Sequence, residues 1–312
     1  MLRFVVFLVA AASLAQSVSA QKQICITVDD LPTVSRVYQT AGGRDTLTQR
    51  LLSHLTHHRV PAIGFVIGNL LLTESRVDSG QIRLLNRWLD AGMELGNHTF
   101  AHKDYNNVSA PVYQQDVLGG ETLLKPLLQQ RGQSLRYFRH PFLHRGNTPG
   151  KCDSLSQFLS SRGYQEAPVS VDNGDYLFSA AYDRALLQHN ATLAASVGNQ
   201  YVSYMLDCIH YYEAQADSLF SRPIPHILLM HANTINSVYL GELLTRLAAD
   251  GYSFIPLEQA LQDPAYRSTD KYVGKAGISW LHRWALTQGK KGSFFKGEPE
   301  VPEVINTLAT GR

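Results

Sequence analysis

Two histidines and two carboxylates have the types and the spacing of a metal-dependent hydrolytic site. His98 and His102 are four residues apart, so on one side of a helical turn both imidazoles would reach one ion at a Zn–N distance of about 2.0–2.1 Å. A catalytic zinc site needs about three protein ligands and an open position. Asp29 and Asp30 follow an apolar segment earlier in the chain, and Asp30 is the candidate third ligand. The sequence therefore predicts an Asp-His-His site for a divalent cation.

The remaining polar residues supply the acid and the base that hydrolysis requires. A metal lowers the pKa of water from 15.7 towards ~7, and Asp29 is then free to take the proton as that water attacks a carbonyl carbon. His231 titrates near neutrality and is the candidate acid for the leaving atom. Asp175 would fix the tautomer of His231. Arg139 has two interpretations, because it would either orient Asp29 or bind a carboxylate product.

These residues must be positioned by a scaffold of alternating strands and helices. Short apolar runs, bounded by segments with helical patterning, predict strands at 24–28, 62–67, 94–96, 135–138, 167–171, 227–230 and 253–255. The candidate residues follow the carboxyl ends of these strands, which is the face where βα barrels carry their active sites. We therefore expect a parallel sheet covered by helices, with right-handed crossovers that close it into a barrel.

The expected helices have recognisable boundaries, and two stretches fall outside the repeat. Leucines at helical spacing predict helices at 46–58 and 81–91, and Ser109 with Pro111 begins a third that extends to residue 130. Pro126 is expected to kink or shorten that third helix. More than fifty residues precede the sixth strand, too many for a simple crossover, so they form an insertion with a long helix at 201–220. Residues 263–312 are expected to pack back on the barrel.

Composition limits the class of protein. The chain has 312 residues and is 44% hydrophobic, which suits one catalytic domain at 21–262. A net charge of +2 without a basic block argues against nucleic acid and acidic membrane surfaces as partners. Residues 1–20 have the basic start, apolar run and small-residue end of a signal peptide, so the protein is expected to be exported, periplasmic or extracellular, without stable membrane insertion after cleavage. Three cysteines allow at most one disulfide.

Five short motifs, in chain order, resemble those of the polysaccharide deacetylases with a NodB homology domain. They are Thr27-Val28-Asp29-Asp30, His98-Thr99-Phe100-Ala101-His102, Arg139-His140-Pro141-Phe142, Asp172-Asn173-Gly174-Asp175-Tyr176 and Leu229-Met230-His231. The resemblance spans about residues 24–261. It implies a distorted (β/α)7 barrel, a divalent metal that is usually Zn²⁺, and hydrolysis of an N-acetyl or O-acetyl group on a glycan. Similar ligands also accept Co²⁺ or Ni²⁺.

The same resemblance assigns roles residue by residue. It implies that the base is Asp29, the metal ligands are Asp30, His98 and His102, the acetate-side residue is Arg139, and the acid is His231 with Asp175 as its partner. The substrate contacts expected from these motifs are Pro141, Phe142, Tyr176 and Leu229. The sequence departs from the family pattern at Val28, Leu143 and Tyr176, where Phe, Gly and Trp are usual. No chemical group is lost, but the groove would differ, so the acetylated glycan is not identified.

Several alternatives stay open. His140 and His144 flank Pro141 and are candidates for substrate contact, while Asp172 either joins the site or only caps the turn that follows it. A metalloprotease is disfavoured because Thr99 follows His98, so the HExxH pattern is absent. The remaining alternative is an exported glycan-binding protein that keeps this fold without turnover.

Overall fold

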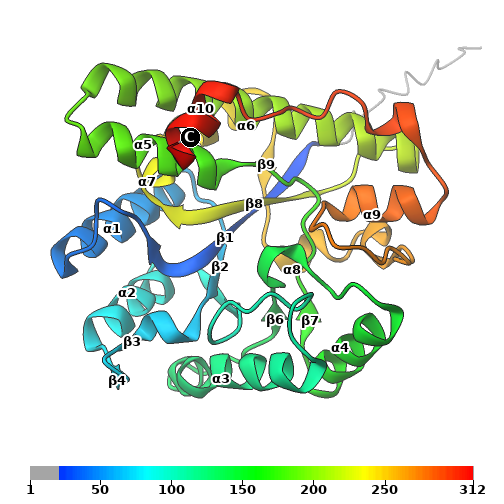
Figure 1. Ribbon diagram of the computed structural model, residues 1–312, viewed down its shortest axis with the longest axis horizontal. Helices are drawn as coiled ribbons and strands as arrows, with labels where there is room; N and C mark the ends of the chain where they lie inside the picture. Colours follow the sequence, from blue (N-terminus) through cyan, green and yellow to red (C-terminus); the bar gives the residue numbers. More distant parts are fainter. Residues whose placement is uncertain (1–20, 312) are drawn as a thin grey trace, which may run out of the picture.

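A curled, parallel β-sheet surrounded by helices forms the centre of the molecule (Figure 1). In residues 21–311, which the computed structural model describes, seven strands form this sheet, in the order β7-β6-β5-β2-β1-β8, with β9 paired to β1. The strands are β1 (Gln23–Val34), β2 (Ile63–Val66), β5 (Glu94–Asn97), β6 (Tyr137–Phe138), β7 (Gln165–Glu166), β8 (His226–Asn233) and β9 (Ser253–Phe254). The predicted signal peptide, residues 1–20, lies outside the described part.

The two edges of the sheet approach each other after β7. Val171 bridges Leu228 of β8 in parallel, and Leu229 donates a backbone hydrogen bond of 3.1 Å to the Val171 carbonyl. This contact curls the sheet round on itself. The predicted α/β fold, a distorted (β/α)7 barrel, is confirmed.

Helices cover the outside of the sheet. They are α1 (Ala41–His57), α2 (Ser79–Asp90), α3 (Ala110–Gln129), α4 (Pro149–Ser161), α5 (Asp175–Leu187), α6 (Ala191–Phe220), α7 (Thr234–Ala249), α8 (Leu257–Ala260), α9 (Trp280–Thr287) and α10 (Glu303–Thr310). Short 3₁₀ helices are η1 (Gly68–Leu71), η2 (Pro141–Leu143), η3 (Pro264–Arg267) and η4 (Gly292–Phe295). The strands β3 (Leu72–Thr73) and β4 (Arg76–Val77) form a separate hairpin, which was not among the predicted strands.

The fifth predicted strand is displaced. A strand was expected at 167–171, but β7 occupies Gln165–Glu166, and only Val171 makes a further bridge. Pro168 has no N–H to donate to a neighbouring strand, which interrupts the pairing between the two points. The third predicted helix, expected to extend to residue 130, is α3, which ends at Gln129 soon after Pro126.

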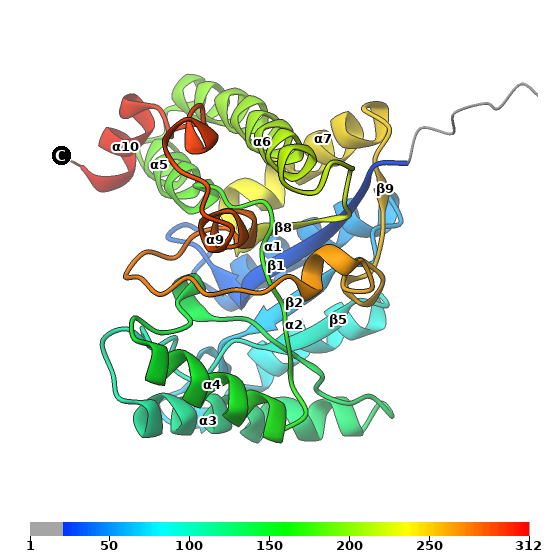
Figure 2. The ribbon, with the colours of Figure 1, turned by 90° about the vertical axis from the view of Figure 1, so that its right-hand side faces the viewer.

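The insertion and the C-terminal extension form a second helical layer (Figure 2). The two insertion helices, α5 and α6, pack against each other and against α7, and α10 at the C-terminal end packs on α5. The chain between α8 and α9 returns to the barrel, where Trp280 donates a backbone hydrogen bond of 2.7 Å to the Val169 carbonyl. Both stretches therefore lie against the barrel rather than apart from it.

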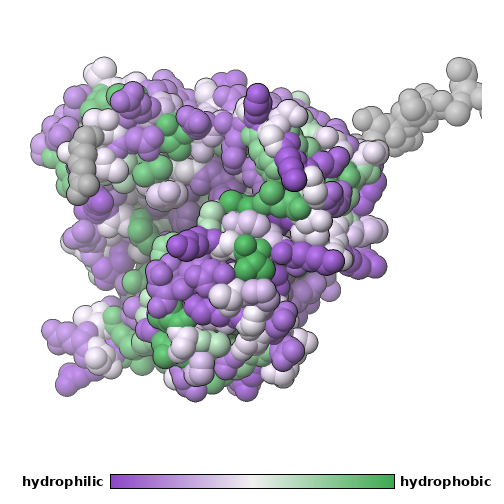
Figure 3. Space-filling model, turned by 45° about the vertical axis from the view of Figure 1, so that its right-hand side comes forward, coloured by the Kyte–Doolittle hydropathy of each residue, from purple (hydrophilic) through white to green (hydrophobic). Residues whose placement is uncertain are grey.

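The core is continuous through the central strands. Ile24, Ile26 and Val28 of β1 are buried, as are Leu228 and Met230 of β8, as expected for a parallel sheet covered on both faces. All three cysteines are free thiols, and Cys25 and Cys208 are buried. Among residues 21–311, none of the helices has the length and apolar character that a membrane span requires. On the face in Figure 3, hydrophobic residues gather in small patches between hydrophilic ones.

Candidate active site

Asp29 and Asp30 line one cavity because β1 is irregular at its carboxyl end. Successive side chains of a regular strand point to opposite faces. The register of β1 shifts after Val28 against β2 and after Asp29 against β8, and Asp30 has a φ of 63°. An irregularity of this kind re-aims a side chain. Both carboxylates therefore reach the cavity at the barrel mouth.

The segment that carries the two histidines is a loop. A helical turn was predicted here, and that prediction is wrong, since Thr99 and His102 have φ values of 66° and 51°. Side chains hold the loop instead: Thr99 donates its N–H to Asn97 Oδ1 at 2.8 Å, and His102 donates its N–H to Thr99 Oγ1 at 3.0 Å. These short polar contacts replace the backbone bonds of a helix and still bring both imidazoles to one side.

Helix α3 packs against this histidine loop and hydrogen-bonds to it. Phe100 donates its N–H to the Asp116 carbonyl at 2.8 Å, and Ala101 donates to the Asp116 carboxylate at 3.2 Å. Gly120 faces the loop so closely that a Cβ there would lie 2.3 Å from Asn97 Oδ1 and 3.0 Å from the Thr99 carbonyl oxygen. A glycine at this position therefore allows the helix and the histidine loop to touch.

Asp30, His98 and His102 form a cluster of metal-ligand type. Their donor atoms all lie within 4.8 Å of one another, with Asp30 Oδ1 at 3.5 Å from His98 Nε2 and 3.6 Å from His102 Nε2. Ligands on one tetrahedral zinc lie about 3.4 Å apart, from bond lengths of about 2.0–2.2 Å. Asp30 Oδ1 is buried without a hydrogen-bond partner in the described part of the chain. The residues present therefore fit a divalent cation.

The tautomer of His98 suits this purpose. Its Nδ1 donates a hydrogen bond of 2.8 Å to the Arg139 carbonyl, which leaves the Nε2 lone pair directed towards the cluster. Burial, helped by the charge of His102, holds the pKa of His98 well below its ordinary value. Burial also lowers the pKa of His102. Both rings are therefore neutral, which is the form that binds a metal.

Asp29 lies between this cluster and a buried arginine. Burial raises the pKa of Asp29 to about 6, although the Arg139 charge opposes the rise. Arg139 is fully buried, approaches Asp29 Oδ2 at 3.5 Å and donates to Thr27 Oγ1 at 2.9 Å. Its guanidinium also lies over the Phe65 ring, 4.7 Å from the centroid. Of its two predicted roles, this position favours orienting Asp29.

His231 is held by Asp175 on the opposite side of the cavity. Its Nδ1 donates to Asp175 Oδ1 at 2.6 Å, and its backbone N–H donates to Asp175 Oδ2 at 2.9 Å. Asn233 and Asn236 donate to the same carboxylate at 3.1 and 2.8 Å. Burial lowers the pKa of His231, but the Asp175 carboxylate outweighs burial and raises it above the ordinary value. In the sheet, His231 of β8 is the register partner of Asp29 of β1.

One cavity of about 460 Å³ joins these groups. Most of the predicted site residues line it, namely Asp29, Asp30, His98, His102, Phe142, Tyr176, Leu229 and His231. Arg139, Asp175 and Pro141 are buried, and these three residues do not line the cavity. Phe142 and Tyr176 are the exposed aromatic residues of the wall, at 53% and 57%.

Five further residues line the cavity, of which His140 and Asp172 were open candidates in the sequence. They are His140, Leu143, Asp172, Asn173 and Gly277. His140 was a candidate for substrate contact, and its Nε2 approaches Glu166 Oε2 at 2.9 Å. Asp172 both lines the cavity and accepts the Asn173 N–H at 2.9 Å, and burial raises its pKa to about 7. Gly277 had no signal in the sequence, because it comes from the C-terminal extension.

The sequence is similar to that of known deacetylases. The family profile described as polysaccharide deacetylase matches residues 16–152. A chitooligosaccharide deacetylase of Bradyrhizobium sp. (strain ANU 289) is 28% identical over 125 residues, which are 40% of this chain and 48% of that protein. The chain thus spans about half the length of the curated relative it matches.

Solved structures share the fold. The peptidoglycan deacetylase PdaC from Bacillus subtilis matches 80% of this chain and 94% of its own, with a TM-score of 0.50 and 17% identity. BA3943, a CE4 family pseudoenzyme from Bacillus anthracis, matches 78% of this chain and 66% of its own, with a TM-score of 0.52 and 16% identity. The chain thus shares the α/β barrel fold of these structures. Over residues 16–152 the sequence is similar to the polysaccharide deacetylases.

Proposed function

We propose that the protein is a metal-dependent hydrolase that removes N-acetyl or O-acetyl groups from a glycan. The observation that carries this proposal is the convergence of Asp30, His98 and His102 in a cavity that Asp29 and His231 also line. A divalent cation bound by these three residues, Zn²⁺ or else Co²⁺ or Ni²⁺, would polarise the acetyl carbonyl and acidify a water molecule.

Asp29 is the proposed general base. Its carboxylate lies 3.7 Å from His98, beside the ligand cluster, and Arg139 holds it from behind. It takes a proton from the attacking water while the new C–O bond forms at the acetyl carbon. The role of Arg139 is to orient this carboxylate and to keep it ionised.

His231 is the proposed general acid. Because Asp175 accepts the Nδ1 proton, Nε2 is the ring nitrogen available to donate to the leaving atom. When the bond between the acetyl carbon and that nitrogen or oxygen breaks, the proton from His231 gives a free amine or hydroxyl on the sugar. The acetyl group leaves as acetic acid, which ionises to acetate in water. Asp29 gives up the proton it took from water and His231 takes one up, which returns both residues to their starting forms.

The cavity wall is proposed to hold the sugar. Phe142 and Tyr176 offer exposed rings, Leu229 an apolar contact, and Asp172 and Asn173 polar groups for hydroxyls. The named relative acts on chitooligosaccharides, so acetylated chitooligosaccharides are the first substrates to test. Export through residues 1–20 would bring the protein to such glycans, and the N-terminus of the mature protein, measured by mass spectrometry, tests that part.

The test is release of acetate from chitooligosaccharides, peptidoglycan and acetylxylan, with and without a chelator. We expect activity on at least one substrate, its loss with the chelator, and its loss in Asp29→Asn. Asp217→Asn is the matched control, because Asp217 is exposed on α6 and outside the cavity wall. Binding of a glycan without any acetate release would instead favour the non-catalytic alternative, which the pseudoenzyme with this fold illustrates.

A further inference from the structure

The segment 268–279, here called the C-terminal strap, reaches the cavity at the barrel mouth through Gly277. It connects η3 to α9 and runs, in orange in Figure 2, between the α5–α6 layer and α4. Its end is fixed to the closing segment of the barrel, where Ser279 Oγ donates to the Ser170 carbonyl at 2.7 Å and Trp280 N donates to the Val169 carbonyl at 2.7 Å. The C-terminal end of the strap is therefore anchored to the segment that closes the barrel.

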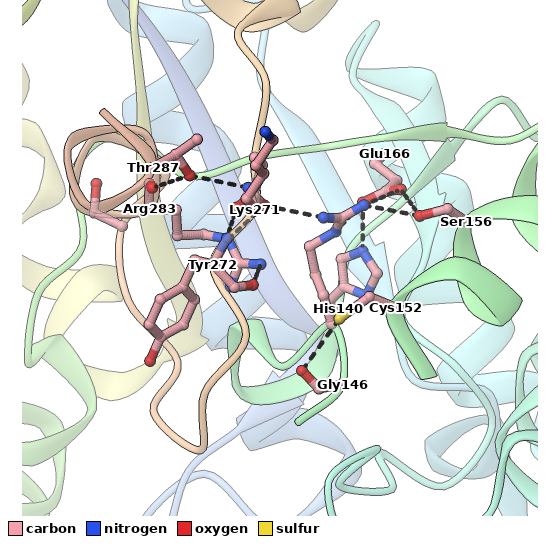
Figure 4. A network of polar contacts seen from close by, with 12 residues as sticks. His140, Gly146, Cys152, Ser156, Glu166, Lys271, Tyr272, Arg283 and Thr287 are labelled. Carbon is pink, nitrogen blue, oxygen red and sulfur yellow. Dashed lines mark hydrogen bonds and ion pairs between the residues drawn. The ribbon is translucent and has the colours of Figure 1, made fainter. Parts of the chain in front are cut away.

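A partly buried ionic network ties the strap to the loop after β6. Asp270 Oδ2 accepts from Arg145 Nη1 at 2.9 Å and from Arg283 Nε at 2.7 Å. Arg145 also binds Glu166 at 2.7 Å, and Glu166 accepts from His140 of the cavity wall. Figure 4 shows this network, with His140 and Glu166 on one side and Arg283 on the other. Removing one partner of such a network leaves the other charges without compensation, which is destabilising. The network therefore anchors the strap firmly to this loop.

The far part of the strap touches the cavity itself. Gly277 lines the cavity, and a Cβ there would lie 1.8 Å from the Phe142 carbonyl oxygen and 3.2 Å from the His144 ring. Asn106, in the loop after β5, donates its side-chain N–H to the Lys275 carbonyl at 3.0 Å. The strap thus joins the loops after β5 and β6 to the segment that closes the barrel, and it contributes Gly277 to the cavity wall on that side.

We propose that the C-terminal strap closes one end of the substrate cavity and restricts the enzyme to an acetylated sugar at or near the end of a glycan chain. This inference rests on the proposed function and names the substrate class within it. Deacetylation of internal residues needs a groove that is open at both ends, so that the chain can leave on either side. Here a glycan extended past Phe142 would meet Gly277 and the strap behind it, in a cavity of about 460 Å³, a volume typical of a small ligand.

Binding and product position test the proposal together. Asp270→Asn weakens the anchor, and Asn106→Ala removes the far contact with little risk to folding. Asp263→Asn is the matched control, because it loses a similar aspartate–arginine pair, to Arg222 at 2.6 Å, outside the strap. Circular dichroism verifies that each variant is folded. The affinity of acetylated chitooligosaccharides of one to six units is measured by calorimetry in an Asp29→Asn background, and acetate-releasing positions on the hexamer are mapped by mass spectrometry.

With the strap intact, we expect affinity to level off at short oligomers and deacetylation to occur at one end. In Asp270→Asn and Asn106→Ala, affinity should keep rising with length, by about threefold or more at the hexamer, and internal positions should react. Identical length dependence in all folded variants, or internal deacetylation by the wild type, overturns the strap proposal alone. Absence of both binding and acetate release in every variant overturns it together with the proposed function.

Discussion

His231 Nδ1 donates a hydrogen bond of 2.6 Å to Asp175 Oδ1, and the fully buried Asp175 accepts three further hydrogen bonds from β8 and α7. These hydrogen bonds hold the Asp175 carboxylate in position, and the carboxylate in turn orients the imidazole of His231. This relationship sets which ring nitrogen carries the exchangeable proton, and it raises the pKa of His231. Two consequences follow for catalysis, one for the rate and one for its pH dependence.

Asp175→Asn should lower kcat by about 10–100-fold with little change in KM, because the imidazole loses its orientation while the cavity wall is kept. The protonated form of His231 is the acid, so the rate falls above its pKa. Since Asp175 raises that pKa, the variant should lose activity at a lower pH than the wild type. The pH profiles of kcat measure both effects, and an unchanged alkaline limb would contradict the role of this pair.

Removal of the metal should abolish acetate release, and Zn²⁺ should restore it. Asp30→Asn and His102→Ala should bind about one metal ion fewer per chain than the wild type, because each loses one of three ligands. Metal content measured by atomic spectroscopy after dialysis tests this. Full activity in a chelated, metal-free preparation is the result that the account does not allow.

Gly120→Ala should weaken metal binding without contacting the metal site. The added Cβ would lie 2.3 Å from Asn97 Oδ1, so the loop that carries His98 and His102 must move away from α3. A shift of this loop by a few tenths of an ångström should reduce metal affinity by about 10–100-fold, as for other residues that orient ligands. Gly150→Ala, in α4 with nothing within 4 Å of the added Cβ, is the control. Calorimetric titration with Zn²⁺ compares the two, and equal affinities would refute the packing argument.

Glu166→Gln should destabilise the fold at neutral pH and less so in acid. Burial raises the pKa of Glu166, but His140 and Arg145 outweigh burial and hold it well below the ordinary value of 4.5. The carboxylate therefore contributes stability that is full above about pH 4.5 and is lost as the pH falls towards its folded pKa. We expect a loss of about 3 kcal/mol at pH 7, measured by urea unfolding. A difference from the wild type that stays constant between pH 7 and pH 3 would contradict this.

The sequence was sufficient where the signal was local. Apolar runs predicted β1 and β8. The polar residues after these strands predicted the site at the cavity that Asp29, Asp30 and His231 line. The sequence was insufficient where geometry depends on distant contacts. The spacing of His98 and His102 suggested a helix, whereas Thr99 and Asn97 hold a loop.

Contacts with later parts of the chain were the hardest to predict. Gly277 enters the cavity wall on a segment that Asp270 ties to Arg145, 125 residues away in sequence. No periodicity marks such a pairing. The burial of Arg139 beneath Asp29 was equally hidden, since a charged residue in a motif is expected at the surface.

The most direct test of the central claim is an anomalous difference map from crystals grown with Zn²⁺. We expect one strong peak about 2.0–2.2 Å from a carboxylate oxygen of Asp30 and from Nε2 of both His98 and His102. A map without a peak between these three residues, or with zinc bound only elsewhere, would contradict it.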